Sequence, residues 1–252
     1  MLSAERKLKI AEMVGKSGGI RTSELSGIFS VSEMTVLRDL ATLEKQGILT
    51  RVYGGAVSSQ SFSAETPNIV REKIRTTEKN KIASLASQLI EEGDNIFLDG
   101  STTTHALAKR LHDFRDIKVV TIGLDILNEL GGIGGIGVIC PGGALDKVTM
   151  NFLGRSTEEF LKNLNSDKAF ISTSGISIKA GLTEPNPQQT LVKKIMLENA
   201  QQKILLADSS KYDVVALNRI CDLCDLDIVI TDNKPDNKYY NFFRQNDIKV
   251  LY

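Results

Sequence analysis

The run Asp99-Gly-Ser-Thr-Thr-Thr104 holds residue types that bind anions, and it directly follows an apolar stretch at 96–98. Backbone N–H groups and small hydroxyls at the start of a helix form a natural phosphate site. One hydroxyl is enough to cap a helix, so four in succession favour anion binding over plain capping. Asp99 would repel a phosphate placed beside it, but it could accept hydrogen bonds from sugar hydroxyls. We therefore expect a phosphorylated sugar or polyol as the ligand.

Comparable residues follow other apolar stretches that look like buried strands. Gly142-Gly143 lies where the backbone must approach something closely, and Thr173-Ser174-Gly175 is small and polar. Asp208-Ser-Ser-Lys211 supplies a carboxylate, two hydroxyls and a cation. Ligands of open α/β sheets bind beyond the carboxyl ends of the strands, so these residues are expected to converge on one rim. A capped loop explains each of them equally well when it is taken alone.

A second group of residues, within Val31–Ala56, suits DNA. A helix is predicted from Ser32 to Gly47, and Ser32 can cap it by accepting the N–H of Thr35. A short strand, a Gly54-Gly55 turn and another short strand follow. One helix face is apolar and expected to be buried, with Val36, Leu40 and Leu43. The other face suits base edges and phosphates, with Thr35, Arg38 and Lys45.

The segment before Ser32 supplies the elements that would position this helix. A first helix starts near Ala4 and ends at Gly18-Gly19, and a short strand at Ile20-Arg21 leads to a helix capped by Thr22. A tight turn at Ser30-Val31 then joins two helices as a helix-turn-helix, and the 47–57 hairpin makes it a winged helix. The expected core positions are Leu8, Ile10, Ala11, Val14, Leu25, Ile28 and Phe29.

This N-terminal pattern resembles the DeoR family of bacterial transcription regulators. The matching residues are Glu24-Leu25, Phe29, Val31-Ser32, Thr35-Val36, Arg38-Asp39-Leu40, Leu43-Glu44, Gly47, Leu49, Arg51 and Gly54-Gly55-Ala56. The family usually has two adjacent arginines, and here the first is Leu37, which removes one cation near the DNA. The expected DNA-binding residues are Arg21, Ser32, Thr35, Arg38, Lys45, Arg51, Tyr53, Gly54 and Gly55.

The rest of the chain alternates between strand-like and helix-like stretches. Strands are predicted at 96–98, 118–122, 137–140, 168–173, 203–208, 227–232 and 248–252, with helices near 102–112, 123–130, 153–163, 188–200 and 236–246. This order predicts an α/β domain with a mainly parallel sheet covered by helices on both faces. The expected boundaries are a DNA-binding domain at 1–57, a Ser-rich linker at 58–67 and an effector domain at 68–252, which opens with a long helix at 69–91.

The larger part also resembles the effector domain of the DeoR family, in Ile96–Thr103, Val119–Thr121, Gly142-Gly143, Gly175-Ile176 and Leu206–Lys211. The resemblance implies a relation to ribose-phosphate isomerases and the sensing of phosphorylated sugars. Ile122-Gly123 stands where the family often has Asn-Ser, a loss of one ligand hydrogen bond. The expected effector-binding residues are Asp99, Gly100, Ser101, Thr102, Thr103, Thr121, Gly142, Gly143, Ser174, Gly175, Asp208 and Lys211.

Composition excludes several function classes. The chain has 31 Lys/Arg and 31 Asp/Glu in 252 residues, so it is not a non-specific nucleic-acid binder, although residues 1–57 carry a net charge of +2. With no long apolar run or signal peptide, and with three unpaired cysteines, we expect a cytoplasmic protein. Cys221-Asp-Leu-Cys224 lacks a second pair, and with two histidines, His105 and His112, no metal site is expected. Gly132–Gly137 matches a dinucleotide pattern but leads into a strand, so no cofactor is expected.

These expectations combine into one functional prediction. We predict a repressor of a sugar or polyol operon, acting on double-stranded operator DNA as a homo-oligomer, either dimer or tetramer, and controlled by a phosphorylated sugar. The alternative is a sugar-phosphate isomerase with an accessory N-terminal module, in which Asp99, Asp208 and Lys211 would serve as base and electrophile. A transcriptional activator would differ from a repressor only in where its operator lies.

Overall fold

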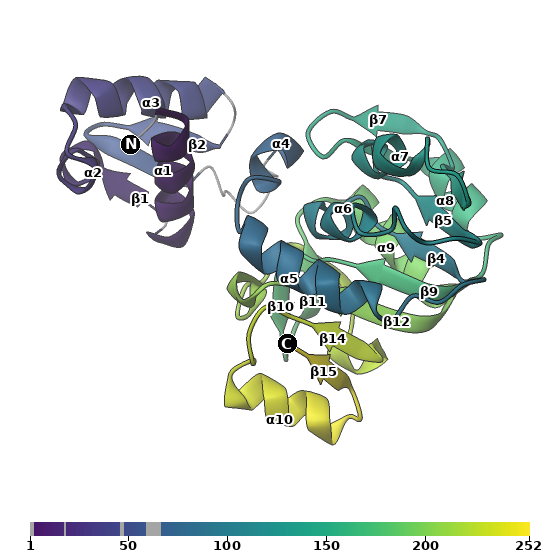
Figure 1. Cartoon of the computed structure of the whole chain (residues 1–252). Coiled ribbons are helices and arrows are strands. Elements are labelled where there is room, and N and C mark those ends of the chain that lie inside the picture. Colours follow the sequence, from purple (N-terminus) through teal and green to yellow (C-terminus); the bar gives the residue numbers. More distant parts are fainter. Residues whose placement is uncertain (1–2, 18, 46–47, 59–66) are drawn as a thin grey trace. The chain divides into compact units, whose positions relative to one another are not determined.

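The computed structural model describes residues 3–17, 19–45, 48–58 and 67–252, and it divides into two compact units, Met1–Ile74 and Arg75–Tyr252 (Figure 1). The boundary at residue 74 lies later in the chain than the expected start of the larger domain at residue 68. Most of the predicted linker at 58–67 lies outside the described residues.

The first unit has the predicted order of elements. Its helices are α1 (Ser3–Ser17), α2 (Thr22–Phe29) and α3 (Glu33–Lys45), and its strands are β1 (Gly19–Arg21), β2 (Leu49–Val52) and β3 (Gly55–Ser58). The strands form one antiparallel sheet in the order β1-β3-β2. The β2–β3 hairpin follows α3 directly, so the prediction of a winged helix-turn-helix is confirmed.

The core of this unit confirms most of the predicted positions and corrects two. Ile10, Val14, Leu25, Val36 and Leu40 are among its buried residues. Phe29 is half-buried and packs against this core, whereas Leu8 is only half-buried and Ile28 is 50% exposed. Ile28 is exposed because α2 spans only eight residues and buries a narrow face through Thr22 and Leu25. Thr22 was expected to cap α2, but Arg21 holds the cap position without a side-chain hydrogen bond, so that prediction was wrong.

The long helix predicted for 69–91 is broken in two. The structure has α4 (Asn68–Arg71) and α5 (Thr76–Ser87), and between them Arg75 takes the left-handed conformation, with φ = 53°. Few residues other than glycine adopt this conformation, and it ends helical periodicity. The apolar spacing had carried across the break because Val70 and Ile82 are buried on either side of it.

A seven-stranded parallel sheet forms the centre of the second unit, as predicted (Figure 1). In spatial order its strands are β15 (Lys249–Leu251), β14 (Ile228–Ile230), β12 (Ala200–Leu206), β9 (Ser166–Ile171), β4 (Asn95–Leu98), β5 (Ile117–Thr121) and β6 (Ile136–Ile139). The order reverses between β4 and β9, because β5 and β6 extend the sheet in one direction and the later strands extend it in the other. Ligands of doubly wound sheets bind at such a reversal point, beyond the carboxyl ends of the strands.

Helices cover both faces of this sheet, and a separate apolar core lies under each layer. One core contains residues of α5, α6 (Thr102–Ala108) and α7 (Leu124–Leu130). The other contains residues of α8 (Arg155–Leu161), α9 (Pro187–Glu198) and α10 (Asn237–Gln245). Phe97 belongs to the second core while Ile96 and Leu98 belong to the first, since side chains alternate along a strand. All five helices predicted after residue 100 are present.

Two small sheets escaped prediction. The hairpin β7 (Ala144–Asp146) and β8 (Asn151–Leu153) follows β6, and β10 (Gly175–Ser177), β11 (Gly181–Glu184) and β13 (Asn218–Cys221) form an antiparallel sheet. These strands have three or four residues each, too few for alternation to stand out in the sequence. Phe152 donates its N–H to Ile122 O, so β8 lies at the carboxyl end of β5.

Candidate functional sites

The start of α3 has the predicted cap. Thr35 N donates to Ser32 Oγ over 3.3 Å, and the two hydroxyl oxygens lie 2.9 Å apart. Ser32 and Arg38 are exposed, whereas Val36 and Leu40 on the opposite face are fully buried. Leu37 is 39% exposed beside Arg38, so the residue that replaces the family's first arginine lies on the solvent side. This face can therefore present one cation and two hydroxyls to a partner.

The wing is held in place by close backbone contact with β1. A Cβ at Gly55 would lie 2.4 Å from Ile20 O, and Thr22 N donates to Gly54 O over 2.9 Å. Gly54 has φ = 78°, a left-handed conformation that glycine adopts without strain. The Gly54-Gly55 pair thus serves the hairpin itself, and only a backbone contact to DNA remains possible for it.

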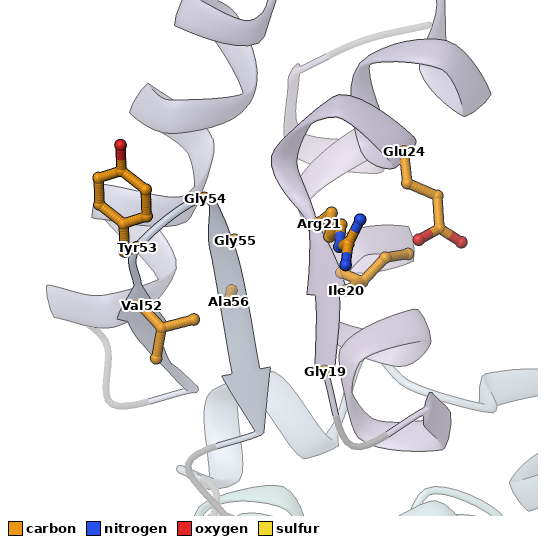
Figure 2. Close-up of a pocket in the computed structure, with 9 residues that line it drawn as sticks. All are labelled: Gly19, Ile20, Arg21, Glu24, Val52, Tyr53, Gly54, Gly55 and Ala56. Carbon is orange, nitrogen blue, oxygen red and sulfur yellow. The ribbon is translucent and has the colours of Figure 1, made fainter.

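A surface pocket lies between the wing and β1, and Figure 2 shows its lining. Tyr53 and Val52 project from the hairpin, and Arg21 and Glu24 lie across from them. Tyr53 is fully exposed, so its ring covers no apolar core. An exposed aromatic ring and a guanidinium at a wing tip suit contact with a nucleic-acid backbone or groove.

Arg51 has an internal partner that the sequence did not predict. Its Nε donates to Glu44 over 2.6 Å, and its N–H donates to the same carboxylate over 2.9 Å. The backbone N–H of Arg51, followed by its side chain, lowers the pKa of Glu44. This pair ties the end of α3 to β2 and neutralises the arginine. Lys45 is the last residue of α3, and its side chain lies outside the described part of the chain.

A buried ion pair inside the first unit was also missed. Arg6 Nε lies 2.6 Å from Asp39 Oδ2, and both side chains are at least nine-tenths buried. Ser3 Oγ donates to the same carboxylate over 3.3 Å. Asp39 therefore locks α3 against α1, next to the exposed Arg38. The only sequence signal was that an acid at position 39 adjoins the buried Leu40.

At the rim of the large sheet, Asp99 joins the loops that follow β4 and β9. It is fully buried, and Ser172 N donates to its Oδ2 over 2.8 Å. Ser101 N and the hydroxyl of Thr104 donate to its Oδ1 over 3.0 and 2.8 Å. These donors already use both carboxylate oxygens. Asp99 therefore has a structural role in joining these loops, and its expected role as an acceptor for sugar hydroxyls stays a prediction.

The hydroxyl run after Asp99 divides into two pairs. Ser101 caps α6 by accepting Thr104 N over 3.2 Å, and its hydroxyl lies 2.9 Å from that of Thr104. Thr102 and Thr103 are 4% exposed, and none of the hydrogen bonds of the described residues uses their side chains. Two hydroxyls therefore build the loop, and the other two remain for a ligand.

Below this loop, Lys193 from α9 forms a buried charge cluster that was not predicted. Its ammonium is bound to Glu184, donates to Ser172 O over 2.9 Å and lies 3.3 Å from Asp99 Oδ2. Glu184 also accepts the hydroxyl of Ser174 over 2.6 Å. Ser174 is thereby turned toward the protein. The sequence shows Lys193 only as one of two adjacent lysines, and nothing in it distinguishes the buried one.

Asn151, on β8, was likewise not predicted. It is 2% exposed, and its Oδ1 has no hydrogen-bond partner among the described residues. A Cβ at Gly100 would lie 1.6 Å from this oxygen, and one at Gly123 would lie 3.6 Å from it. The carboxamide thus fits between the loops that follow β4 and β5, where only a glycine at position 100 leaves room for it.

The other glycines of the expected site approach protein atoms. A Cβ at Gly143 would lie 2.2 Å from Thr157 Oγ1, and one at Gly175 would lie 2.3 Å from Val214 O. Gly142 O accepts the hydroxyl of Thr157 over 2.7 Å. The close approach expected at these glycines is therefore to neighbouring elements. Thr121 is fully buried, and its hydroxyl accepts Gly123 N over 3.1 Å.

Asp208 follows β12 and binds its own loop. Ser210 N donates to its Oδ1 over 2.9 Å, and Arg75 Nε lies 3.5 Å from the same oxygen. Burial opposes ionisation, but the charge of Lys211, the Ser210 hydrogen bonds and the charge of Arg75 outweigh it and lower the pKa of Asp208. Lys211 is half-buried in the same turn, so its cation already faces a carboxylate.

The remaining motifs have structural places. Gly132–Gly137 joins α7 to β6, as predicted, and so cannot open a helix. Cys221 ends β13, and burial raises its pKa to about 12, while Cys224 is exposed. No group of three metal-ligating side chains gathers within the described residues. Over the same residues, every helix is too short or too polar to span a bilayer.

Comparison with known proteins agrees with this architecture, which is that of a DNA-binding regulator with a sensor domain. Residues 6–62 match the DeoR-like helix-turn-helix domain, and residues 74–233 match the DeoR C terminal sensor domain. The chain therefore belongs to the DeoR family of transcriptional regulators. It is a regulator and not an enzyme.

Several relatives align over almost their whole length. An uncharacterised HTH-type transcriptional regulator, YulB of Bacillus subtilis, is 39% identical over 99% of this chain and 96% of its own. The HTH-type transcriptional repressor GlcR of Bacillus subtilis is 34% identical over 100% of this chain and 96% of its own. The putative aga operon transcriptional repressor of Escherichia coli O157:H7 is 31% identical over 91% of this chain and 86% of its own. A ribose 5-phosphate isomerase from Methanocaldococcus jannaschii shares 18% identity and a TM-score of 0.40 over 53% of each chain, too little to bear on function.

Proposed function

We propose that this regulator represses a sugar or polyol operon and that a phosphorylated sugar controls its affinity for operator DNA. Two observations support the proposal: α3 exposes Ser32 and Arg38, and the loop after β4 leaves the Thr102 and Thr103 hydroxyls without a hydrogen bond among the described residues. The relatives named as repressors, GlcR and the putative aga operon repressor, support the direction of control.

For DNA, the proposed contacts come from α3 and the wing. Ser32, Thr35 and Arg38 would enter the major groove, and Arg21, Tyr53 and the Gly54-Gly55 backbone would contact phosphates or the minor groove. Arg51 would contribute less, because Glu44 already binds it. One such module buries little surface, so two modules of a homo-oligomer are needed for affinity, most simply a dimer on an inverted repeat.

For the effector, the proposed site is the loop after β4 together with its neighbours at the β4/β9 reversal. Thr102 and Thr103 would donate their hydroxyls to a phosphate, along with backbone N–H groups of the same loop. Gly100 and Thr121 would shape the floor, and Lys211 would add a cation from the β12 loop. A cytoplasmic location follows from the proposed role, because the operator and the phosphorylated sugars both lie in that compartment.

A binding assay with the chain's own upstream region tests the proposal. Purified full-length protein should shift this fragment at concentrations where random duplex of the same length stays free. One or more sugar phosphates should change the midpoint of that shift, while their unphosphorylated parents leave it unchanged. Equal binding to random duplex under all conditions would refute the proposed function.

A further inference from the structure

We propose that Asn151 is a ligand-binding residue of the sensor domain and that its side-chain oxygen accepts a hydrogen bond from a hydroxyl of the sugar. This inference rests on the proposed function, because it assigns a residue to the same effector site. It adds a contact from β8. This strand was not predicted from the sequence, and it contains none of the motifs that follow the predicted strands.

The argument begins with an unsatisfied acceptor. Asn151 Oδ1 is buried and has no partner among the described residues. A buried polar atom without a hydrogen bond destabilises the fold, and most buried polar atoms in folded proteins have partners. The polar groups around this atom do have partners, because Asp99, Ser101 and Thr104 form hydrogen bonds with one another. An unused acceptor beside a fully bonded network indicates that a ligand supplies the missing donor.

The position of the oxygen indicates which ligand atom it meets. It lies against Gly100, directly before the free hydroxyls of Thr102 and Thr103, and also faces Gly123 at the end of β5. A phosphate held by Thr102 and Thr103 would place the adjoining carbon chain near Asn151. A carboxamide oxygen accepts but cannot donate, so it selects a hydroxyl and disfavours a second phosphate oxygen. The class of ligand is thus a sugar phosphate with a hydroxyl close to its phosphate-bearing end.

Gly100 explains why the site takes this form. A methyl group at position 100 would displace the Asn151 carboxamide, since its carbon would lie 1.6 Å from Oδ1 and 2.4 Å from Cγ. The glycine therefore admits the asparagine to the loop. Gly123 leaves space on the other side of the same oxygen, where a longer side chain would reach toward it.

The test uses full-length protein, its Asn151→Leu and Asn151→Asp variants, and the control Asn163→Leu, an exposed asparagine at the end of α8. The probes are inorganic phosphate, D-ribose 5-phosphate, D-glucose 6-phosphate and D-fructose 6-phosphate, each titrated by calorimetry. Leucine has nearly the shape of asparagine but no acceptor. Asn151→Leu should weaken the binding of the tightest-binding sugar phosphate roughly 3- to 10-fold, the range expected for one hydrogen bond. It should leave the affinity for inorganic phosphate unchanged.

Asn151→Asp separates this role from a structural one. It keeps an oxygen acceptor but adds a negative charge, so it should weaken the binding of every anion, inorganic phosphate included. Thermal unfolding of the free proteins gives a second readout, since Asn151→Leu removes an unsatisfied atom and should not lower the melting temperature. A leucine variant that binds every probe as the wild type does would overturn the inference and leave the proposed function intact. Wild-type protein that binds none of the probes would overturn both.

Discussion

Ser32 in the first unit and Ser101 in the second cap their helices in the same way. Each accepts the N–H of a threonine three residues on, over 3.3 and 3.2 Å, and each hydroxyl pair is separated by 2.9 Å. The Ser32 pair lies near the surface, whereas the Ser101 pair is buried and Thr104 also donates to Asp99. Local sequence therefore sets the cap, and burial decides its use. The exposed cap at Ser32 is accessible to a partner such as DNA, whereas the buried cap at Ser101 fixes the loop that follows β4.

The largest expected effect comes from removing the buried positive charge of Lys193, which lies next to Asp99 at the buried Ser101 cap. Lys193→Met should lower the free energy of unfolding by about 3–5 kcal/mol, because Glu184 and Asp99 would lose their buried cation. Chemical denaturation of the full-length protein measures this loss. Lys194→Met is the matched control and should stay within about 0.5 kcal/mol, since its side chain is half-exposed. Equal costs for the two variants would contradict the role given to the buried cluster.

At the exposed cap the expected effect is on DNA. Arg38→Ala should weaken binding to the upstream fragment by about 1–3 kcal/mol, because an exposed arginine of the recognition helix contacts a base or phosphate. Fluorescence anisotropy with labelled duplex measures the dissociation constant. Lys9→Ala removes an exposed cation from α1 and serves as the control. If Arg38→Ala and Lys9→Ala reduce affinity alike, general charge rather than the α3 face carries the binding.

Leu37 allows the same face to be strengthened. Leu37→Arg should raise DNA affinity and steepen the dependence of log K on log salt by about one, the change expected for one further phosphate contact. Titrations at several salt concentrations measure the slope. An unchanged slope would show that position 37 does not lie near the backbone of the duplex.

A matched pair of substitutions compares the caps directly. Thr104→Val should cost about 1–3 kcal/mol of stability, since Asp99 would lose a buried hydrogen bond. Thr35→Val, at the exposed cap, should change stability by less than about 0.5 kcal/mol yet weaken DNA binding. Thermal denaturation and anisotropy of both variants provide the two readouts. A large stability loss from Thr35→Val would remove the distinction between the two caps.

The smallest effect concerns pH. The pKa of Asp208 is lower in the folded protein than in the unfolded chain, so its ionisation stabilises the fold above the unfolded pKa. That contribution is lost as the pH falls through the folded pKa. Asp208→Asn should therefore flatten the decline in stability on the acid side of about pH 4 and leave its slope near neutrality unchanged. Denaturation midpoints across the acid range measure the difference.

The sequence by itself determined the elements and their order. Helical spacing located α3, and the buried Val36 and Leu40 confirm the predicted face. Apolar runs located all seven strands of the large sheet, because strands buried on both faces are continuously apolar. The cap at Ser32 was readable as well, since a cap bonds only to its own next turn.

Only the tertiary structure decided which side chains are free to act. Asp99, Ser174 and Gly143 have types that suit a ligand, and only the fold shows that each of them also contacts atoms from distant segments of the chain. Lys193 and Asn151 carry no local signal, because their roles depend on strands and helices that meet only after folding. Spacing reports contacts within one element, whereas hydrogen-bond partners and burial at a sheet rim depend on several elements at once.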